Sequence, residues 1–179
     1  NPAQTIYTGY AVSSEWEAVN NLQIGGRNYI RGSNYVTNVA AWNSLPTVQI
    51  EGNIRYVRYN YAWGFNQYGV YIPAGTYVFS GLFRAPNGAG YARFYSSKGE
   101  CYIYINHTDW RKHSGTVTLT EDITSFCILE GNDSGTYLDF AQLKLEKGNK
   151  ATDWTPAPED VQAEIDAASD AVNALDTYI

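Results

Sequence analysis

The chain has 179 residues, enough for one domain with a hydrophobic core plus appendages, and its formal net charge is −6. This acidic balance argues against non-specific nucleic-acid binding, which needs a basic surface. There is no apolar run of about 18 residues, so we expect no membrane insertion. Methionine is absent, at position 1 as well, so we expect a fragment or a processed product.

Tyrosine and glycine are frequent, with 16 residues each, while charged residues make up only 17% of the chain. Tyrosine favours strands, and its flat apolar ring with a polar tip suits wet binding surfaces. The composition therefore predicts an extracellular type of β-sandwich. Cys101 and Cys127 both lie in strand-like runs, where free buried thiols are favoured and a disulfide is the open alternative.

Residues 1–26 contain a strand-like run and a serine-capped segment long enough for two helical turns, and we interpret them as a lead-in from an upstream region. From Arg27 onward, short strand-like runs alternate with Gly, Asn and Pro, and a loop-rich stretch surrounds Trp42. The expected strands cover residues 28–31, 53–63, 69–72, 76–84, 91–95, 101–106, 116–119, 125–129 and 137–146. Their spacing of about ten residues predicts an all-β fold, an antiparallel β-sandwich of the jelly-roll type.

The stretch 143–160 ends the β region and begins a helix. Its alternating leucines predict a last strand with one buried face, and Gly148 interrupts that strand. Trp154 is expected to fold back and pack against the sandwich. Pro156 and Pro158 then stop the β region, and the acidic residues after them open a helix.

The helix after Pro158 carries one narrow apolar stripe with the alternating spacing of a coiled-coil seam. Acidic residues at its start suit the positive end of the helix dipole. A narrow stripe predicts packing on partner helices, and docking on the domain's own surface is the alternative. We expect the stem to continue beyond this sequence. The residues predicted to drive oligomerisation are Val161, Ile165, Ala168, Val172, Leu175 and Ile179.

Two parts of the chain resemble a recurring signature of bacteriophage and prophage tail proteins. One reads LKLEKG at 143–148 and ATDWTPAPED at 151–160, and the other reads LQIGGRNYI at 22–30. In that family these motifs bracket a carbohydrate-binding-module-like jelly roll of tail fibre or tail-tip receptor-binding proteins. Between them, IPAGTYVFS at 72–80 is similar to a strand, turn and strand common in such modules. The resemblance covers residues 22–160.

The resemblance implies a carbohydrate-binding-module-like β-sandwich in residues 27–155 and the start of a coiled-coil stem in residues 156–179. It also implies a homo-oligomer, a trimer, located in the virion tail and acting outside the host cell. The implied partners are host cell-wall or surface polysaccharide and other tail proteins. The seam itself has features of two-stranded coils, so the trimer follows from the family alone.

A carbohydrate site uses aromatic faces against the apolar face of a sugar ring, with polar groups for the hydroxyls. The run 59–68 is the densest aromatic set, and the segments around Arg84 and 91–95 form a second. Trp110 with nearby polar residues forms a third set, and Trp42 a fourth. A core or cross-strand position is the competing interpretation for each aromatic. The candidate carbohydrate-binding residues are Tyr61, Trp63, Phe65, Arg84, Tyr91, Arg93 and Trp110.

No phosphate-binding loop, nucleophile elbow or zinc-protease motif occurs, so we expect no catalytic residues. His107 and His113 flank Asp109 and could serve a metal or acid–base chemistry, but we favour a polar surface loop. The oxygen-rich run 130–135 could hold a structural calcium ion, and we favour a plain turn. No cofactor and no metal are therefore expected.

These observations predict a non-catalytic phage tail module that binds host cell-surface carbohydrate within an oligomeric fibre. The alternative is a purely structural spacer or decoration domain with no glycan ligand. A polysaccharide-degrading domain is a third interpretation, and it would require two carboxylates about 5–10 Å apart in a cleft.

Overall fold

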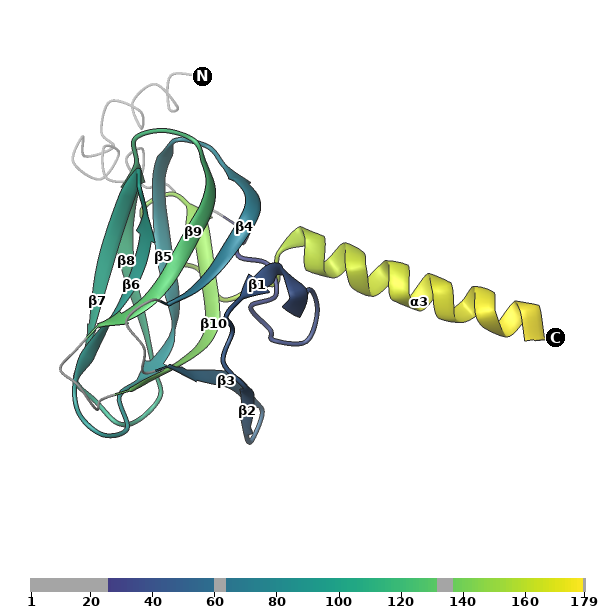
Figure 1. Cartoon of the computed structure of the whole chain (residues 1–179), viewed down its shortest axis with the longest axis horizontal. Coiled ribbons are helices and arrows are strands. Elements are labelled where there is room, and N and C mark those ends of the chain that lie inside the picture. The colour runs from purple at the N-terminus through teal and green to yellow at the C-terminus, as the bar shows by residue number, and fades with distance from the viewer. Residues whose placement is uncertain (1–25, 60–63, 132–136, 179) are drawn as a thin grey trace, which may run out of the picture.

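The computed structural model describes residues 26–59, 64–131 and 137–178, which form two antiparallel sheets and one long C-terminal helix (Figure 1). One sheet has the strand order β1-β4-β9-β6-β7, and the other has the order β2-β3-β10-β5-β8. The elements are η1 (Val39–Ala41), β1 (Trp42–Asn43), β2 (Val48–Glu51), β3 (Ile54–Tyr59), β4 (Phe65–Ile72), β5 (Gly75–Arg84), β6 (Gly90–Ser96), β7 (Gly99–Ile105), β8 (Arg111–Leu119), β9 (Ile123–Gly131), β10 (Leu138–Lys147) and α3 (Pro158–Tyr178).

The pairing of the strands is that of a jelly roll. β3 pairs with β10, β4 with β9, β5 with β8 and β6 with β7, and all four pairs are antiparallel. An antiparallel ribbon in which the first strand meets the last, the second meets the last but one, and so on, wraps into two facing sheets. The predicted β-sandwich is therefore confirmed, and β1 and β2 extend one edge of each sheet.

The core lies between the two sheets and is rich in phenylalanine. Phe83 packs edge-on against Phe140, and Phe140 packs in the same way against Phe65 of the facing sheet, each at 5.7 Å between ring centroids. Phe94 stacks on Phe126 at 5.2 Å. All five side chains are buried. Such pairs add about 0.5–1.5 kcal/mol each beyond the area that they bury.

The strand predictions hold best in the middle of the chain. β5, β6, β7 and β10 begin and end within two residues of the predicted bounds. β8 and β9 are longer than predicted, and the two short strands β1 and β2 were not predicted at all. Short edge strands carry few alternating residues, so local pattern says little about them.

Residues 28–31 do not form the predicted strand, because the Asn28 side chain takes up hydrogen bonds that a neighbouring strand would use. Asn28 Oδ1 accepts from the backbone N–H of Leu145 at 3.1 Å. Asn28 Nδ2 donates to the carbonyl oxygens of Leu143 and Thr155, both at 3.0 Å. This fully buried amide therefore ties the start of the described chain to β10 and to the segment before the helix.

After β10 the chain turns back across the sheet and covers two buried charged residues. Lys144 Nζ donates to Thr152 Oγ1 at 2.9 Å, and Glu146 Oε1 accepts from the same hydroxyl at 2.6 Å. Trp154 Nε1 donates to Ser33 Oγ at 3.1 Å. Trp154 thus folds back on the sandwich, as the sequence predicted.

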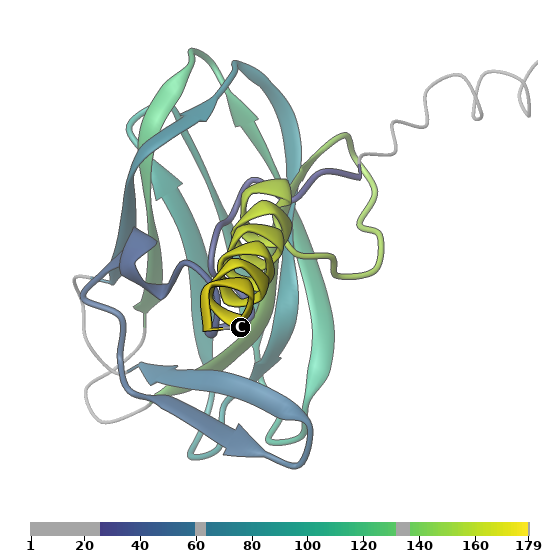
Figure 2. The same cartoon turned by 90° about the vertical axis from the view of Figure 1, so that its right-hand side faces the viewer.

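The root of α3 is fastened to the loop that follows the first described residues, and the helix projects away from the sandwich (Figures 1 and 2). The buried Asp160 carboxylate accepts from the Gly32 N–H at 2.8 Å and from Asn38 Nδ2 at 2.7 Å. One turn later, Glu164 Oε1 accepts from Thr37 Oγ1 at 3.0 Å. Within the described ranges, no helix has the length and apolar composition of a membrane span.

Asp160 makes stability depend on pH. Burial raises the pKa of its carboxyl above the ordinary value of 3.8, although hydrogen bonds from Asn38 and Gly32 oppose the shift. The folded chain therefore binds this proton more tightly than the unfolded chain does. The contribution of Asp160 to stability is greatest below its unfolded pKa and falls as pH rises through the raised pKa.

We expect Asp160→Asn to remove this dependence. Urea unfolding of both proteins at several pH values from about 3 to 7 would measure it. The difference in free energy of unfolding, variant minus parent, should move in favour of the variant as pH rises. A difference that stays constant with pH would contradict the role given to Asp160.

Candidate functional site

Four tyrosines form an exposed patch on the outer face of β6 and β7. Side chains alternate along a strand, and in both strands one parity is buried in the core while the other faces outward. Tyr104 is 74% exposed, while Tyr102 and Tyr95 are 41% and 40% exposed. The name tyrosine patch is used below for Tyr91, Arg93, Tyr95, Glu100, Tyr102 and Tyr104.

The antiparallel register places these rings against one another. Tyr91 lies opposite Tyr104, and Arg93 lies opposite Tyr102. The Tyr91 ring packs edge-on against Tyr102 at 5.1 Å and against Tyr104 at 6.0 Å. The rings of Tyr102 and Tyr104 are nearly parallel, with an interplanar angle of 17°. The rings therefore form one continuous apolar surface.

Arg93 lies within the patch and supplies its charge. The Arg93 Cζ atom is 4.6 Å from the ring centroid of Tyr95 and 5.0 Å from that of Tyr102. Arg93 Nε donates to Glu100 Oε2 at 2.6 Å. Burial raises the pKa of the Tyr102 phenol, so this hydroxyl stays protonated at neutral pH.

This combination of groups suits a sugar. Sugar rings have apolar faces that pack on aromatic rings, and their hydroxyls pair with guanidinium, carboxylate and phenol groups. A contiguous exposed aromatic surface on a protein also marks an interaction site more often than chance exposure does. Tyr91 and Arg93 were predicted as site residues, and Tyr95 lies in the same candidate run, 91–95, but was not selected. Glu100, Tyr102 and Tyr104 were not predicted. Their signal was the alternation of Tyr102 and Tyr104 with buried residues in β7.

Arg84 and Trp110 belong to an ion network associated with the other sheet and do not join the tyrosine patch. The Arg84 Cζ atom lies 4.3 Å from the centroid of Trp110. Arg84 donates to Asp139 Oδ2 at 2.7 Å and to the two Glu51 carboxylate oxygens at 3.0 and 2.7 Å. Arg58 donates to both oxygens of the same Asp139 at 2.7 and 3.0 Å. The Arg84 guanidinium is therefore occupied by protein carboxylates.

Phe65 is a core residue, which corrects its prediction as a sugar contact. It has no exposed surface and packs against Trp42 at 5.1 Å and Tyr59 at 5.5 Å between ring centroids. In β4 only the first positions of this parity, Phe65 and Gln67, are buried, and after Gly69, which has a φ of 67°, the inward positions are Val70 and Ile72. Tyr61 and Trp63 lie outside the described residues.

A groove beside the hinge, which is the segment 148–157 between β10 and α3, was not predicted as a site. Two pockets of about 340 and 180 Å³ share the side chains of Gln142 and Trp154. Lys112 and Asp153 line the larger pocket, and Arg55 lines the smaller one. Gln142 has a φ of 51° in the irregular part of β10, and such bulges often re-aim a side chain. Sequence pattern offered no signal for Gln142, and Trp154 was interpreted only as a packing residue.

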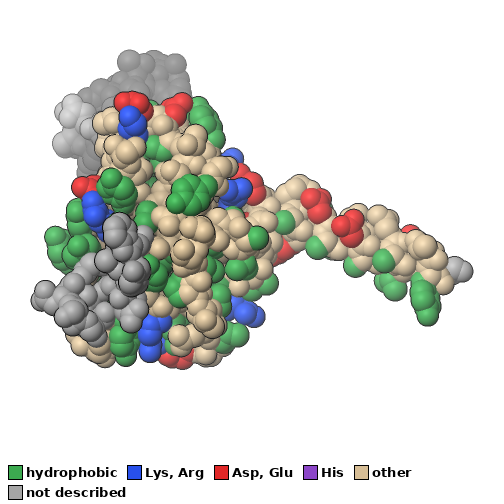
Figure 3. Space-filling view, in the orientation of Figure 1, with side chains coloured by type: hydrophobic (Ala, Val, Ile, Leu, Met, Phe, Trp, Pro, Cys, Tyr) green, Lys and Arg blue, Asp and Glu red, His purple; other side chains and the backbone are tan. Residues whose placement is uncertain are grey.

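The apolar side chains of the predicted seam are exposed along α3. Figure 3 shows hydrophobic side chains gathered along one side of the helix and acidic ones along another. Ile179 lies outside the described residues. The exposed seam residues are Val161, Ile165, Ala168, Val172 and Leu175.

His107 and His113 form a pair and do not share one surface loop, which corrects that prediction. His113 lies in β8, and His107 is buried. Their rings stack, and the two Nε2 atoms are 2.6 Å apart, so one donates to the other. Burial, with repulsion from His107, lowers the pKa of His113. In the described part of the chain, no group of three or more His, Cys, Asp or Glu residues is placed to hold a metal ion.

Neither Cys101 nor Cys127 forms a disulfide in the described part of the chain. Burial raises the pKa of Cys101 and of Cys127 to about 11, so neither is a thiolate at neutral pH. The run predicted as a calcium site or a turn lies mostly outside the described residues, which stop at Gly131 and resume at Tyr137.

Neither a family model nor a curated protein sequence matches the chain. Among similar solved structures, the carbohydrate-binding module CBM6cm-2 of Cellvibrio mixtus lichenase 5A, in complex with cellotriose, is 21% identical, with 63% of this chain and 96% of that chain covered and a TM-score of 0.44. The tripod (BppUct-A-L) from the baseplate of bacteriophage Tuc2009 is 17% identical, with 77% and 60% covered and a TM-score of 0.44. The CBM22-1–GH10 modules of Clostridium thermocellum xylanase 10B, complexed with xylohexaose, are 13% identical, with 73% and 30% covered and a TM-score of 0.47.

These structures comprise carbohydrate-binding modules, one of them joined to a GH10 module, and a phage baseplate protein. All three identities are low and all three TM-scores are below 0.5. What those proteins bind is therefore not assigned to this chain.

Proposed function

We propose that this chain is a non-catalytic carbohydrate-binding module of a phage tail protein and that the tyrosine patch contacts the host polysaccharide. The observation that carries the proposal is the continuous aromatic surface of the half-buried Tyr91 and the exposed Tyr102 and Tyr104, with Arg93 among the rings. Aromatic faces with a few polar groups are the usual means of holding sugar rings.

The non-catalytic part of the proposal is supported by the two carboxylates that pair with Arg84, a residue predicted from the sequence as a sugar contact. Hydrogen bonds from Arg84 lower the pKa of Glu51. The buried Asp139 is held by Arg58 and Arg84 together. A general acid needs a pKa near the working pH, and the lowered pKa of Glu51 is a shift in the opposite direction.

The tail context is supported by the signature motifs of the sequence and by the exposed seam of α3. On this proposal, residues 27–155 form the carbohydrate-binding unit and residues 156–179 begin a coiled-coil stem. Copies of the chain assemble through the stem into a homo-oligomer, a trimer by analogy with the resembled family, within the virion tail. Other tail proteins are then its neighbours, and polysaccharide on the host surface is its ligand.

A purely structural role for the module is the second candidate function, and one observation favours it. Several aromatics with sugar-binding chemistry serve the architecture instead, namely Phe65 and Trp42 in the core and Trp110 against Arg84. On this alternative the seam of α3 would be the functional surface, and the tyrosine patch would contact a neighbouring tail protein.

The double substitution Tyr102→Ala and Tyr104→Ala separates the two candidates. We expect it to weaken binding to host cell-wall polysaccharide about tenfold or more, since each aromatic contact contributes about 0.5–1.5 kcal/mol beyond its area. Isothermal titration calorimetry with the purified polysaccharide measures the affinity, and thermal unfolding checks that both proteins are folded.

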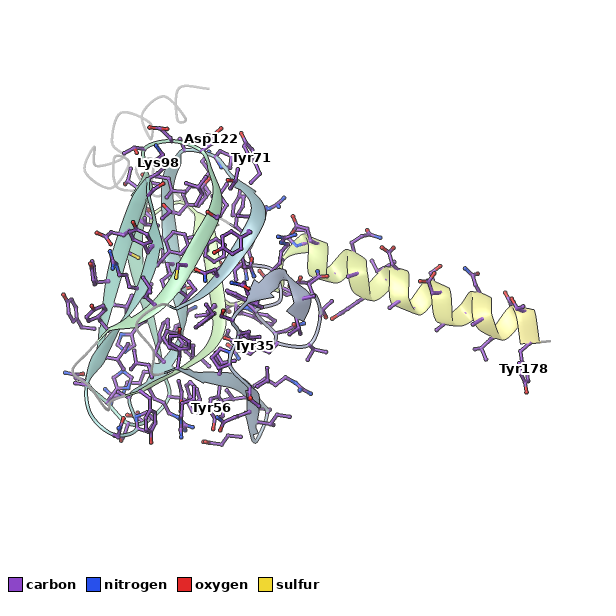
Figure 4. All side chains as sticks on the ribbon, in the orientation of Figure 1. Tyr35, Tyr56, Tyr71, Lys98, Asp122 and Tyr178 are labelled. Atoms are coloured by element: carbon purple, nitrogen blue, oxygen red, sulfur yellow. The ribbon has the colours of Figure 1, made fainter. Side chains whose placement is uncertain are left out.

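Tyr178→Ala is the matched control, because Tyr178 is an exposed tyrosine near the far end of α3 (Figure 4). It should leave the affinity unchanged. Parent protein that binds no host glycan, or a folded double variant that binds as tightly as the parent, would favour the structural role.

A further inference from the structure

A pocket of about 290 Å³ lies where the start of the described chain, β4 and the root of α3 meet. Arg27, Tyr29 and Arg31 come from the first of these segments, Tyr71 comes from β4, and Glu159 comes from α3. Figure 4 places Tyr71 at one end of the sandwich, on the side from which the helix leaves. The tyrosine patch lies on β6 and β7, which are separated from β4 by β9. The pocket is therefore a separate site.

Arg31 has hydrogen-bond donors to spare in this pocket. Its guanidinium makes one bond in the described part of the chain, from NH2 to the carbonyl oxygen of Tyr68 at 3.3 Å. Its Nε is buried and has no partner among the described residues. A guanidinium carries five N–H donors, so Arg31 has more donors than the partners that the described chain gives it. Because Arg31 lines the pocket, its terminal N–H groups can donate to an acceptor from outside the chain.

Arg27 is paired, but the pair is easily exchanged. Arg27 binds the Glu159 carboxylate, and the two side chains are 48% and 42% exposed. Exposed ion pairs are weak, so a second carboxylate or phosphate can compete with Glu159 for Arg27. With two guanidinium groups and one carboxylate, the charged side chains that line the pocket sum to +1. The lining therefore favours an anion over a cation.

Two aromatic rings complete the pocket. The Arg27 Cζ atom lies 4.8 Å from the ring centroid of Tyr29, whose ring packs edge-on against Tyr77 at 5.5 Å. Tyr71 OH donates to Asp122 Oδ2 at 2.8 Å, which holds the second ring in place. Anchored phenols beside cationic donors offer an apolar face and a charged end to one ligand.

We propose that this pocket binds an anionic sugar, one that carries a carboxylate or a phosphate group, with Arg31 on the anionic group. Tyr29 and Tyr71 contact the sugar ring, and Glu159 competes with the ligand for Arg27. The sugar part of this inference rests on the proposed carbohydrate-binding function. The anionic part rests on the arginines alone.

The test uses two variants with opposite expected effects. Binding of galacturonate, galactose 6-phosphate, galactose and inorganic phosphate to the whole chain is measured by NMR titration at low salt. Arg31→Gln should weaken binding of the acidic sugars about tenfold or more, because it removes charge-assisted hydrogen bonds. Glu159→Gln should tighten it about two- to fivefold by removing the competing carboxylate. Lys150→Gln, which removes one exposed positive charge outside the pocket, should change it little.

Each outcome decides a part of the proposal. The proposal is supported if either acidic sugar binds, if the variants change its affinity as stated, and if galactose binds more weakly. The acidic sugar that binds more tightly identifies the anionic group. Inorganic phosphate bound as tightly as galactose 6-phosphate would overturn the sugar part. No binding of either acid, or weaker binding by Glu159→Gln, would overturn the pocket itself. The Tyr102→Ala and Tyr104→Ala double variant should keep this binding, so failure at the tyrosine patch is seen separately.

Discussion

Replacing Asp139 with alanine is expected to lower the free energy of unfolding by about 3–5 kcal/mol, because it leaves two arginines without their shared partner. Asp139 is fully buried, and Arg84 is only 12% exposed. Burial opposes the charge on Arg84, but hydrogen bonds to Glu51 and Asp139 hold its pKa above its ordinary value. Without Asp139, the buried guanidinium keeps its charge and loses its central acceptor. Denaturation with urea, followed by tryptophan fluorescence, measures the loss.

Glu51→Gln is the matched control for Asp139→Ala. Glu51 pairs with the same Arg84, but its side chain is 54% exposed. Exposed pairs contribute less than about 1 kcal/mol, so this variant should lose little stability. Equal and small losses in the two variants would show that the network is as weak as a surface ion pair. The comparison therefore contrasts a buried partner with an exposed partner of the same guanidinium.

Introducing aspartate at Ile165 and Val172 is expected to convert the proposed oligomer into a monomer. Both side chains are exposed on α3 in the single chain, and they occupy the same core position in successive heptads of the seam. In a coiled coil, every copy would then bury two charges in the core. The free-energy cost of burying them exceeds what the short apolar seam contributes to association. Analytical ultracentrifugation of parent and variant measures the change.

Ala167→Asp with Asn173→Asp is the control, because it adds the same two charges to the same helix away from the seam. This variant should remain oligomeric. The described helix α3 contains six acidic residues and no basic one, so charge repulsion between copies opposes association. Added salt should strengthen association because it screens this repulsion. A monomeric parent, or a seam variant that keeps the mass of the parent, would show that the seam does not organise the assembly.

The interior strands were predictable because the signals that mark them are local. In β6 and β7, buried and outward residues alternate. β5 and β10 are buried along most of their length, and apolar and aromatic residues next to turn residues marked them instead. The parity of β4 was not predictable, since aromatics lie on both of its faces. Phe65 is buried while Tyr68 and Tyr71 are exposed, and Gly69 has a φ of 67° between them. The prediction for Phe65 failed for this reason.

Part of the tyrosine patch was predictable, and part of it depended on pairing. Tyr91 and Arg93 lie in a run whose composition alone suggested a sugar contact. Tyr102 and Tyr104 complete the surface only because β6 and β7 pair in one particular register. A shift of one residue would turn every one of these rings toward the core. Composition identifies aromatic segments, and register decides which rings share a face.

The sequence by itself determined the strands of the sandwich interior, the hinge around Trp154 and the seam of α3. Each of these depends on residues a few positions apart, so periodicity and turn residues suffice to specify it. Only the tertiary structure decided the exposed tyrosine patch, the Asp139 network and the pocket of Arg31 and Glu159. Their members come from strands and loops far apart in the chain, and long-range sheet pairing brings them together. That pairing depends on how the whole core packs, and no local segment carries the information.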